Sequence, residues 1–128
     1  MERVTGIGGL FFRAREPASL ARWYQEHLGV TMTPSDTVAD PWRQEAGPTV
    51  FAPFPELTEY FGDAGRLWMV NFRVRDLDAM IAQLRAAGIM VTPDPKPYPN
   101  GRFARLYDPE DNPIELWEPS GRDEPGAA

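Results

Sequence analysis

The segment Phe72-Arg73-Val74-Arg75-Asp76 repeats the pattern of Phe12-Arg13-Ala14-Arg15-Glu16, which lies sixty residues earlier in the chain. A second match follows at an offset of fifty-nine, where AGIMVTP at 87–93 echoes LGVTMTP at 28–34. Similarity at a fixed spacing is the signature of a repeated structural unit. We therefore predict two similar halves of about sixty residues each.

Each half begins with an alternating apolar run, which is typical of a strand with one face on a core. In the second half, Val70, Phe72 and Val74 are expected to face that core. A helix follows in each half, because the next apolar residues recur at helical spacing. The two apolar stripes are Leu20, Trp23, Tyr24 and Leu28 in the first half, and Leu77, Met80, Ile81 and Leu84 in the second.

The ends of these helices are marked by residues with suitable backbone preferences. Pro17 suits a first turn and Asp76 an N-cap, while Gly29 and Gly88 suit the ends. Short apolar segments after each helix predict further strands. These are 30–33, 42–46 and 49–54 in the first half, and 89–92, 103–107 and 114–118 in the second. Each half is therefore predicted to contain a strand, a helix and three further strands, in that order.

The amino-acid composition limits which binding partners and which cellular location we expect for the protein. The chain has 128 residues, 42% of them hydrophobic, which suits one ordinary domain. Thirteen basic and nineteen acidic residues give 13 − 19 = −6, a charge that disfavours nucleic acid and anionic lipid. The sequence shows neither a spanning segment nor a secretory signal, so we expect a cytoplasmic protein. Without cysteine, thiolate metal sites and cysteine nucleophiles are excluded.

We expect one domain over residues 1–119, with repeat one at about 4–62 and repeat two at about 66–119. Residues 53–65 mix proline, acidic residues and aromatics, which indicates an ordered loop or a short helical turn joining the halves. Residues 120–128 contain little to bury, so they are expected to form a flexible tail.

The motif DPEDNPIELWEP, at residues 108–119 near the end of the chain, is the part of the sequence most typical of a known protein family. Together with the doubled unit and the Gly29-Val30 pair after the first helix, it resembles the vicinal oxygen chelate superfamily, which includes glyoxalases, bleomycin-resistance proteins and extradiol dioxygenases. The resemblance implies an α+β fold in which two βαβββ repeats form a curved mixed sheet around a cavity. Asp111 stands where the family commonly has glycine, and aspartate tolerates the tight turn.

The family's metal ligands carry over to four positions in this chain. These are Gly9, Val50, Met69 and Glu115, of which only Glu115 is a plausible ligand. One carboxylate cannot hold a catalytic metal, because such sites need about three protein ligands. We therefore expect no metal ligands and no cofactor, with a divalent metal kept as the alternative.

Two further residues bear on a metal site. Glu45 could join Glu115 in a shifted strand register, although a surface ion pair with Arg43 is the more ordinary interpretation. His27, the only histidine, lies near the end of the first helix and is expected to be solvated there.

Strand alternation indicates which side chains enter the cavity that the resemblance implies. Gly9, Phe11 and Arg13 share one face, as do Met69, Asn71 and Arg73, and Glu115 points with Trp117. The candidate ligand-binding residues are Phe11, Phe51, Met69, Asn71, Arg73 and Trp117. Each aromatic could instead be ordinary core. The arginines could reach solvent, or Arg73 could pair with Glu115.

Two classes of function compete. The first is a binding protein that resembles bleomycin-resistance proteins, which sequester an aromatic or amphipathic metabolite without transforming it and so give antibiotic resistance. The second is a glyoxalase-like lyase, isomerase or dioxygenase, dependent on a metal or using Glu115 as a base. Burial beside Trp117 would suit a base by raising the pKa of a carboxyl group. The implied partner is a small molecule in either case.

A homodimer is the expected assembly, because small halves bury little surface and curved sheets have edges to cover. The apolar residues around the middle of the chain could pack against a second copy. They are Phe51, Phe54, Tyr60, Phe61, Leu67 and Trp68. The alternative is that the middle loop folds back as a lid and shields them within a monomer.

Overall fold

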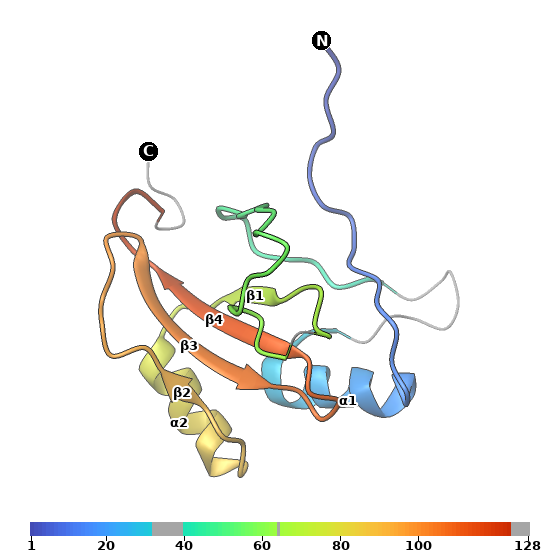
Figure 1. Cartoon of the computed structure of the whole chain (residues 1–128), viewed down its shortest axis with the longest axis vertical. Helices are drawn as coiled ribbons and strands as arrows, with labels where there is room; N and C mark the ends of the chain where they lie inside the picture. Colours follow the sequence, from blue (N-terminus) through green and yellow to red (C-terminus); the bar gives the residue numbers. More distant parts are fainter. Residues whose placement is uncertain (32–39, 64, 124–128) are drawn as a thin grey trace.

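A four-stranded mixed sheet with the strand order β1-β4-β3-β2 carries the fold (Figure 1). Its strands are β1 (Val70–Arg73), β2 (Thr92–Pro93), β3 (Gly101–Tyr107) and β4 (Pro113–Pro119). β4 is parallel to β1 and antiparallel to β3, which is antiparallel to β2. This computed structural model describes residues 1–31, 40–63 and 65–123.

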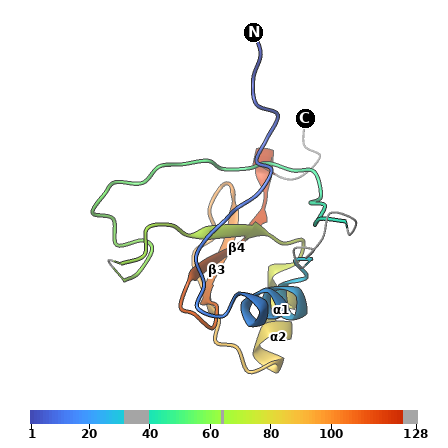
Figure 2. The ribbon, with the colours of Figure 1, turned by 90° about the vertical axis from the view of Figure 1, so that its right-hand side faces the viewer.

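Two helices, α1 (Pro17–Leu28) and α2 (Leu77–Ala86), lie on one side of the sheet. Figure 2 shows both helices on that side, while the green stretch that precedes β1 projects on the other. The predicted apolar stripes thus fall within the two observed helices. In the part of the chain that the structure describes, neither helix is long and apolar enough to cross a bilayer.

The core lies between the helices and one face of the sheet. Strand residues that point to this face are almost fully buried, including Leu106, Ile114 and Leu116. Leu77 and Leu84 of α2 pack in the same cluster. Val70, Phe72 and Val74 pack at its edge, as the alternation predicts. The opposite face of the sheet is left for polar and aromatic residues, because successive strand residues point to opposite sides.

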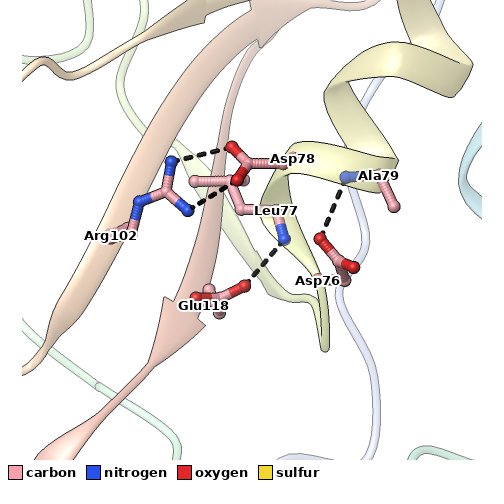
Figure 3. A network of polar contacts seen from close by, with 6 residues as sticks. All are labelled: Asp76, Leu77, Asp78, Ala79, Arg102 and Glu118. Carbon is pink, nitrogen blue, oxygen red and sulfur yellow. Dashed lines mark hydrogen bonds and ion pairs between the residues drawn. The ribbon is translucent and has the colours of Figure 1, made fainter.

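The start of α2 is fixed to the sheet by a set of polar contacts (Figure 3). The Asp76 side chain accepts a hydrogen bond from the Ala79 amide at 3.0 Å, as its predicted capping role requires. A Glu118 carboxylate oxygen accepts from the Leu77 amide at 2.8 Å. These acceptors satisfy amides that the first turn of a helix leaves free. In addition, Arg102 of β3 pairs with Asp78 at 2.8 Å.

Among its described residues, the first half forms its predicted helix but none of its predicted strands. Residues 40–54 include no strand, so the predictions for 42–46 and 49–54 are wrong for this structure. The stretch before α1 likewise runs as a single extended segment away from the body of the molecule (Figure 1). Residues 30 and 31 are not in a strand, and 32–33 lie outside the described residues. A strand needs a neighbouring strand to pair with, and within the described part of one chain these segments pair with no strand.

The second half follows the prediction more closely. The predicted strands 103–107 and 114–118 lie within β3 and β4, whereas the prediction for 89–92 is reduced to its last residue in β2. The first residues of the expected flexible tail are structured. Gly121–Asp123 form a turn of 3-10 helix, and the Ser120 amide donates a hydrogen bond to the Asn100 carbonyl at 3.2 Å. Residues 124–128 lie outside the described part. The predicted α+β class is confirmed.

Candidate functional site

A row of three polar side chains crosses the sheet on the face away from the helices. Asn71 of β1 and Arg105 of β3 are both directly opposite Glu115 of β4. Residues directly opposite one another in neighbouring strands project to the same face. Glu115 and Arg105 are half-buried, and Asn71 is exposed. The row therefore presents an acceptor, a donor and a cation side by side.

Glu115 is held by two hydrogen bonds, one to each carboxylate oxygen. The Asn71 amide nitrogen donates to Oε1 at 2.7 Å. The Tyr60 hydroxyl donates to Oε2. Tyr60 comes from the segment between the halves, so the middle loop folds back over the open face. Because each of its carboxylate oxygens accepts a hydrogen bond, Glu115 serves as an anchor for hydrogen-bond donors.

Arg105 fastens the middle loop to the same row. Its guanidinium donates to the backbone carbonyl of Tyr60 and lies 2.9 Å from the Met69 sulfur. The guanidinium carbon is 4.8 Å from the centroid of the Tyr60 ring, which is within the range of a cation–π contact. Predicted site residue Met69 is therefore at the site, in contact with Arg105.

The Tyr60 phenol is kept in its neutral form. Burial, followed by the hydrogen bond to Glu115 and the charge of that carboxylate, raises the pKa of Tyr60 to about 12, while Arg105 opposes the rise. The ring stacks on Phe54, with 5.5 Å between centroids and an interplanar angle of 25°. Tyr60 thus acts as a hydrogen-bond donor at neutral pH.

An aromatic pair flanks the polar row. Phe103 and Trp117 are directly opposite each other, and their rings are parallel with centroids 6.2 Å apart. Trp117 is only 3% exposed, and its indole nitrogen donates to the Asn100 carbonyl at 2.8 Å. Trp117 lies on the predicted face beside Glu115, but it forms the floor of the site, and Phe103 presents the more accessible ring.

Three predicted site residues do not converge on Glu115. Arg73 lies opposite Trp117 but donates to the Glu45 carbonyl at 3.0 Å, and its second guanidinium nitrogen is buried without a partner. Phe11 is 94% exposed and Phe51 is 86% exposed, in segments that join no sheet. Their placement was predicted from strand alternation, which cannot apply where no strand forms.

Three residues of the site, Tyr60, Phe103 and Arg105, are not among the predicted site residues. A signal for Arg105 exists, because it alternates with Phe103 in a predicted strand that neighbours the strand of Glu115. Tyr60 has no such signal. Periodicity does not specify the direction in which a loop folds.

The side chains of this row are not a suitable set of ligands for a divalent metal ion. Glu115 is the one carboxylate in the row, and its neighbours are the Asn71 amide, the Tyr60 phenol and the Arg105 cation. Within residues 1–31, 40–63 and 65–123, no three His, Cys, Asp or Glu side chains lie together as a metal site requires. Glu45 pairs with Arg75, not with Glu115 or Arg43. The polar row therefore lacks the set of ligands that a divalent metal centre needs.

His27 also lies apart from the site. Its ring centroid is 5.5 Å from that of Trp23, and its side chain is partly buried at the end of α1. It is thus less solvated than its position near the helix terminus predicts.

The turn at residues 108–112 is a structural junction. Buried Asp108 accepts hydrogen bonds from the Tyr24 hydroxyl at 2.6 Å and from the backbone and side chain of Asn112 at 3.0 and 2.8 Å. Glu110 accepts from the amides of Arg15 and Glu16, which precede α1. Asp111 has a φ of 63°, so it occupies the left-handed conformation expected at this position. The closing motif therefore joins the first helix to the sheet.

Two surface hollows lie away from Glu115. One, of about 360 Å³, lies between α1 and the turn and is lined partly by Trp23 and Glu110. The other, of about 320 Å³, lies at the start of α2 and includes Arg73 and Asp76. Neither includes the polar row.

Comparisons with known proteins agree with this architecture. Residues 9–117 match the glyoxalase-like domain family. The chain is also similar to the solved structure of a glyoxylase/bleomycin resistance protein/dioxygenase domain from Frankia sp. EAN1pec, with 15% identity and a TM-score of 0.55. That likeness covers 92% of this chain and 100% of the other, and it confirms the predicted glyoxalase/bleomycin-resistance fold.

A second likeness covers less of the chain. TnmS3, an antibiotic binding protein from Streptomyces sp. CB03234, is 41% identical, with a TM-score of 0.37. The match covers 40% of this chain and 41% of TnmS3, so it spans about two fifths of each. No match was found among curated proteins.

Proposed function

Because the chain belongs to the glyoxalase-like domain family, we propose that it binds and sequesters an aromatic or amphipathic small molecule without transforming it. The observation that carries the proposal is the row of Asn71, Glu115 and Arg105 beside the Phe103–Trp117 pair. Aromatic surface supplies contact area in small-molecule sites, and a few polar groups fix orientation. This face of the sheet combines the two.

The proposal rests on the geometry of the row and not on the short likeness to TnmS3. Asn71, Glu115 and Arg105 come from three adjacent strands, so their spacing is set by the backbone. Rigid strands hold polar groups at fixed positions better than loops do. A ligand would meet Glu115 as an acceptor and Arg105 as a cation, while its apolar part lies against Phe103.

The alternative is an enzyme that uses Glu115 as a base. Both oxygens of Glu115 already accept hydrogen bonds, from Asn71 and Tyr60, which favours the anchoring role. Glu115→Gln separates the two functions. It would abolish turnover by a base, whereas a binding protein would keep most of its affinity.

A ligand screen tests the proposal directly. Purified protein is incubated with a panel of aromatic natural products, and bound compounds are measured by calorimetry and recovered intact by mass spectrometry. We expect at least one compound to bind stoichiometrically and to return unchanged. Chemical conversion of the bound compound would contradict sequestration and support the enzymatic alternative.

Substitutions on the open face show where the ligand lies. Met69→Ala and Phe103→Ala should each weaken binding by roughly 1–3 kcal/mol, the usual loss for a buried apolar contact. Met90→Ala is the control, because Met90 is exposed outside this face. Unchanged affinity in both site variants would place the ligand elsewhere.

We also propose a homodimer, which the exposed apolar residues of the first half support. The most exposed large apolar side chains in this half and the segment before β1 include Val4, Phe11, Val50, Phe51, Leu57 and Leu67. Extended segments that present such residues and lack sheet partners suit a second copy of the chain. The lid alternative accounts for Tyr60, which folds back, but not for these six.

Light scattering at micromolar concentration tests the assembly. We expect a mass twice that of the 14.4 kDa chain. A mass of one chain, unchanged on concentration, would contradict the dimer.

A further inference from the structure

Tyr60 makes three kinds of contact at the polar row. Its hydroxyl donates to Glu115, its ring lies 4.8 Å from the Arg105 guanidinium carbon, and the Phe54 ring stacks on it at 5.5 Å. A cation over a ring, a stacked aromatic and an acceptor for the hydroxyl are the contacts by which proteins recognise flat aromatic ligands. The Tyr60 side chain, itself a phenol, thus occupies a position whose contacts would also suit a phenol from outside the protein.

The Tyr60 side chain is not part of the core. It is 44% exposed and belongs to the middle loop, outside the helices and strands. Arg105 also holds the backbone carbonyl of Tyr60, so the loop keeps one attachment to the sheet that does not involve the ring. Rotation of the side chain to another staggered rotamer would therefore free Glu115 while the backbone stays fastened.

We propose that the site selects compounds with an aromatic hydroxyl group, and that such a compound binds by replacing the side chain of Tyr60 on Glu115 and Arg105. This inference rests on the proposed binding function and names its ligand class. The incoming hydroxyl donates to Oε2 of Glu115, as Tyr60 does now. The incoming ring takes the place of the Tyr60 ring beside the guanidinium.

Wild-type affinity would then report a competition between the ligand and Tyr60. A protein whose competent state is a fraction of the population binds more weakly by that fraction. Removing the internal phenol should therefore strengthen binding of an external one. The polar row would also distinguish a hydroxyl from a methyl ether, because only the hydroxyl can donate to a carboxylate.

The test uses phenol as the probe and anisole, its methyl ether, as the comparison. Tyr60→Ala in the full chain should bind phenol roughly tenfold or more tightly than the wild type, because a hydrogen bond to a charged group no longer has to be replaced. The same variant should prefer phenol over anisole by a similar factor. Calorimetry or ligand-observed NMR measures both affinities.

Three further variants control the experiment. Tyr98→Ala removes another tyrosine, which is 41% exposed and donates to Asp94 at 2.9 Å, and it should not gain the preference for phenol. Adding Glu115→Met to Tyr60→Ala should abolish the preference, because methionine fills similar space without the acceptor. Tyr60→Phe, which keeps the ring, should still bind phenol more tightly than the wild type if Tyr60→Ala does not fold.

Failure of this inference differs from failure of the proposed function. Equal binding of phenol and anisole by Tyr60→Ala would overturn the selection of hydroxyl groups while leaving a site for aromatic rings. Absence of any gain in both Tyr60 variants would overturn the replacement of Tyr60. Sequestration itself is judged separately, by whether the wild type returns a bound compound unchanged.

Discussion

The two halves of the chain differ in how their apolar residues are covered. In the second half, the apolar residues of β3, β4 and α2 form a core in which Ile114 and Leu116 are fully buried. In the first half, α1 contributes Leu20 and Tyr24 to that same core, whereas Phe11 and Phe51 are exposed. Similar sequence patterns thus lead to a sheet in one half and, in the described residues of the other, to extended chain that pairs with no strand.

This difference shows that alternation indicates the capacity to form a strand, and that a partner decides whether the strand forms. The short β1 is a strand because β4 offers it a parallel partner from Ile114 to Trp117. The corresponding segment at residues 10–13 has no such neighbour within the described chain. Substitutions in the two halves can therefore test whether the contrast holds in solution.

The largest effect is expected in the core of the second half. Leu116→Ala should lower the free energy of unfolding by about 2–5 kcal/mol, because it leaves a cavity at a site with no solvent access. Phe51→Ala, at a position exposed within one chain, should change it by no more than about 0.5 kcal/mol in protein dilute enough to be monomeric, and by more as the proposed dimer forms. Urea denaturation measures both. A large loss for Phe51→Ala would show that a second copy covers this residue.

Asp108→Ala should have the next largest effect, because Asp108 connects the halves. It leaves the Tyr24 hydroxyl and the groups of Asn112 without their acceptor, at a cost of roughly 2–3 kcal/mol. Amide exchange should show earlier opening of α1 than of α2. Equal loss of protection in both helices would mean that the turn serves the whole core and not the junction.

The helix starts provide a smaller and more closely matched comparison. Asp76 caps α2 through its side chain, whereas Glu16, at the equivalent position of α1, makes no side-chain cap. Asp76→Ala should therefore cost about 1 kcal/mol and Glu16→Ala less than about 0.5 kcal/mol. Thermal unfolding of the two variants checks the difference. Equal costs would contradict the distinction between the two caps.

The smallest expected effect is the loss of the stabilising contribution of Glu110 at acidic pH. Hydrogen bonds from the amides of Arg15 and Glu16 hold the pKa of Glu110 below its ordinary value of 4.5. A carboxyl group with a lowered folded pKa stabilises the fold above its unfolded pKa and loses that contribution as pH falls through the folded value. Wild type should therefore exceed Glu110→Gln in stability above about pH 5, and the difference should vanish at lower pH.

The control for this titration is Glu2→Gln, in the exposed N-terminal segment. It should leave the dependence of stability on pH unchanged. A constant difference between wild type and Glu110→Gln across the acid range would show that hydrogen bonding and not charge is responsible.

Much of the fold could be predicted because its signals are local. The helical stripe around Leu20 and Tyr24 and the cap at Asp76 specify helices through nearby residues. The strands of the second half pair with one another within that half. The strands predicted at 42–46 and 49–54 failed because pairing is a property of two segments, and the sequence of one segment does not identify its partner.

The candidate site could be predicted from the sequence only where its residues lie on strands that form as expected. Alternation correctly placed Asn71, Glu115 and Trp117 on one face, since β1 and β4 exist as expected. Arg73 lies on that face but turns to Glu45, because a long side chain can choose among several acceptors. Tyr60 was missed as a site residue because its position depends on how an irregular loop folds back.

The junction at residues 108–112 also affects how the chain acquires its structure during synthesis. Tyr24 meets Asp108 across 84 positions, so α1 leaves the ribosome long before its acceptor exists. At translation rates of about 5–20 residues per second, the wait is roughly 4–17 s. During this interval the apolar stripe of α1 has no sheet to cover it. Nascent chains would then be most vulnerable to proteases and most in need of chaperones just before the final motif emerges.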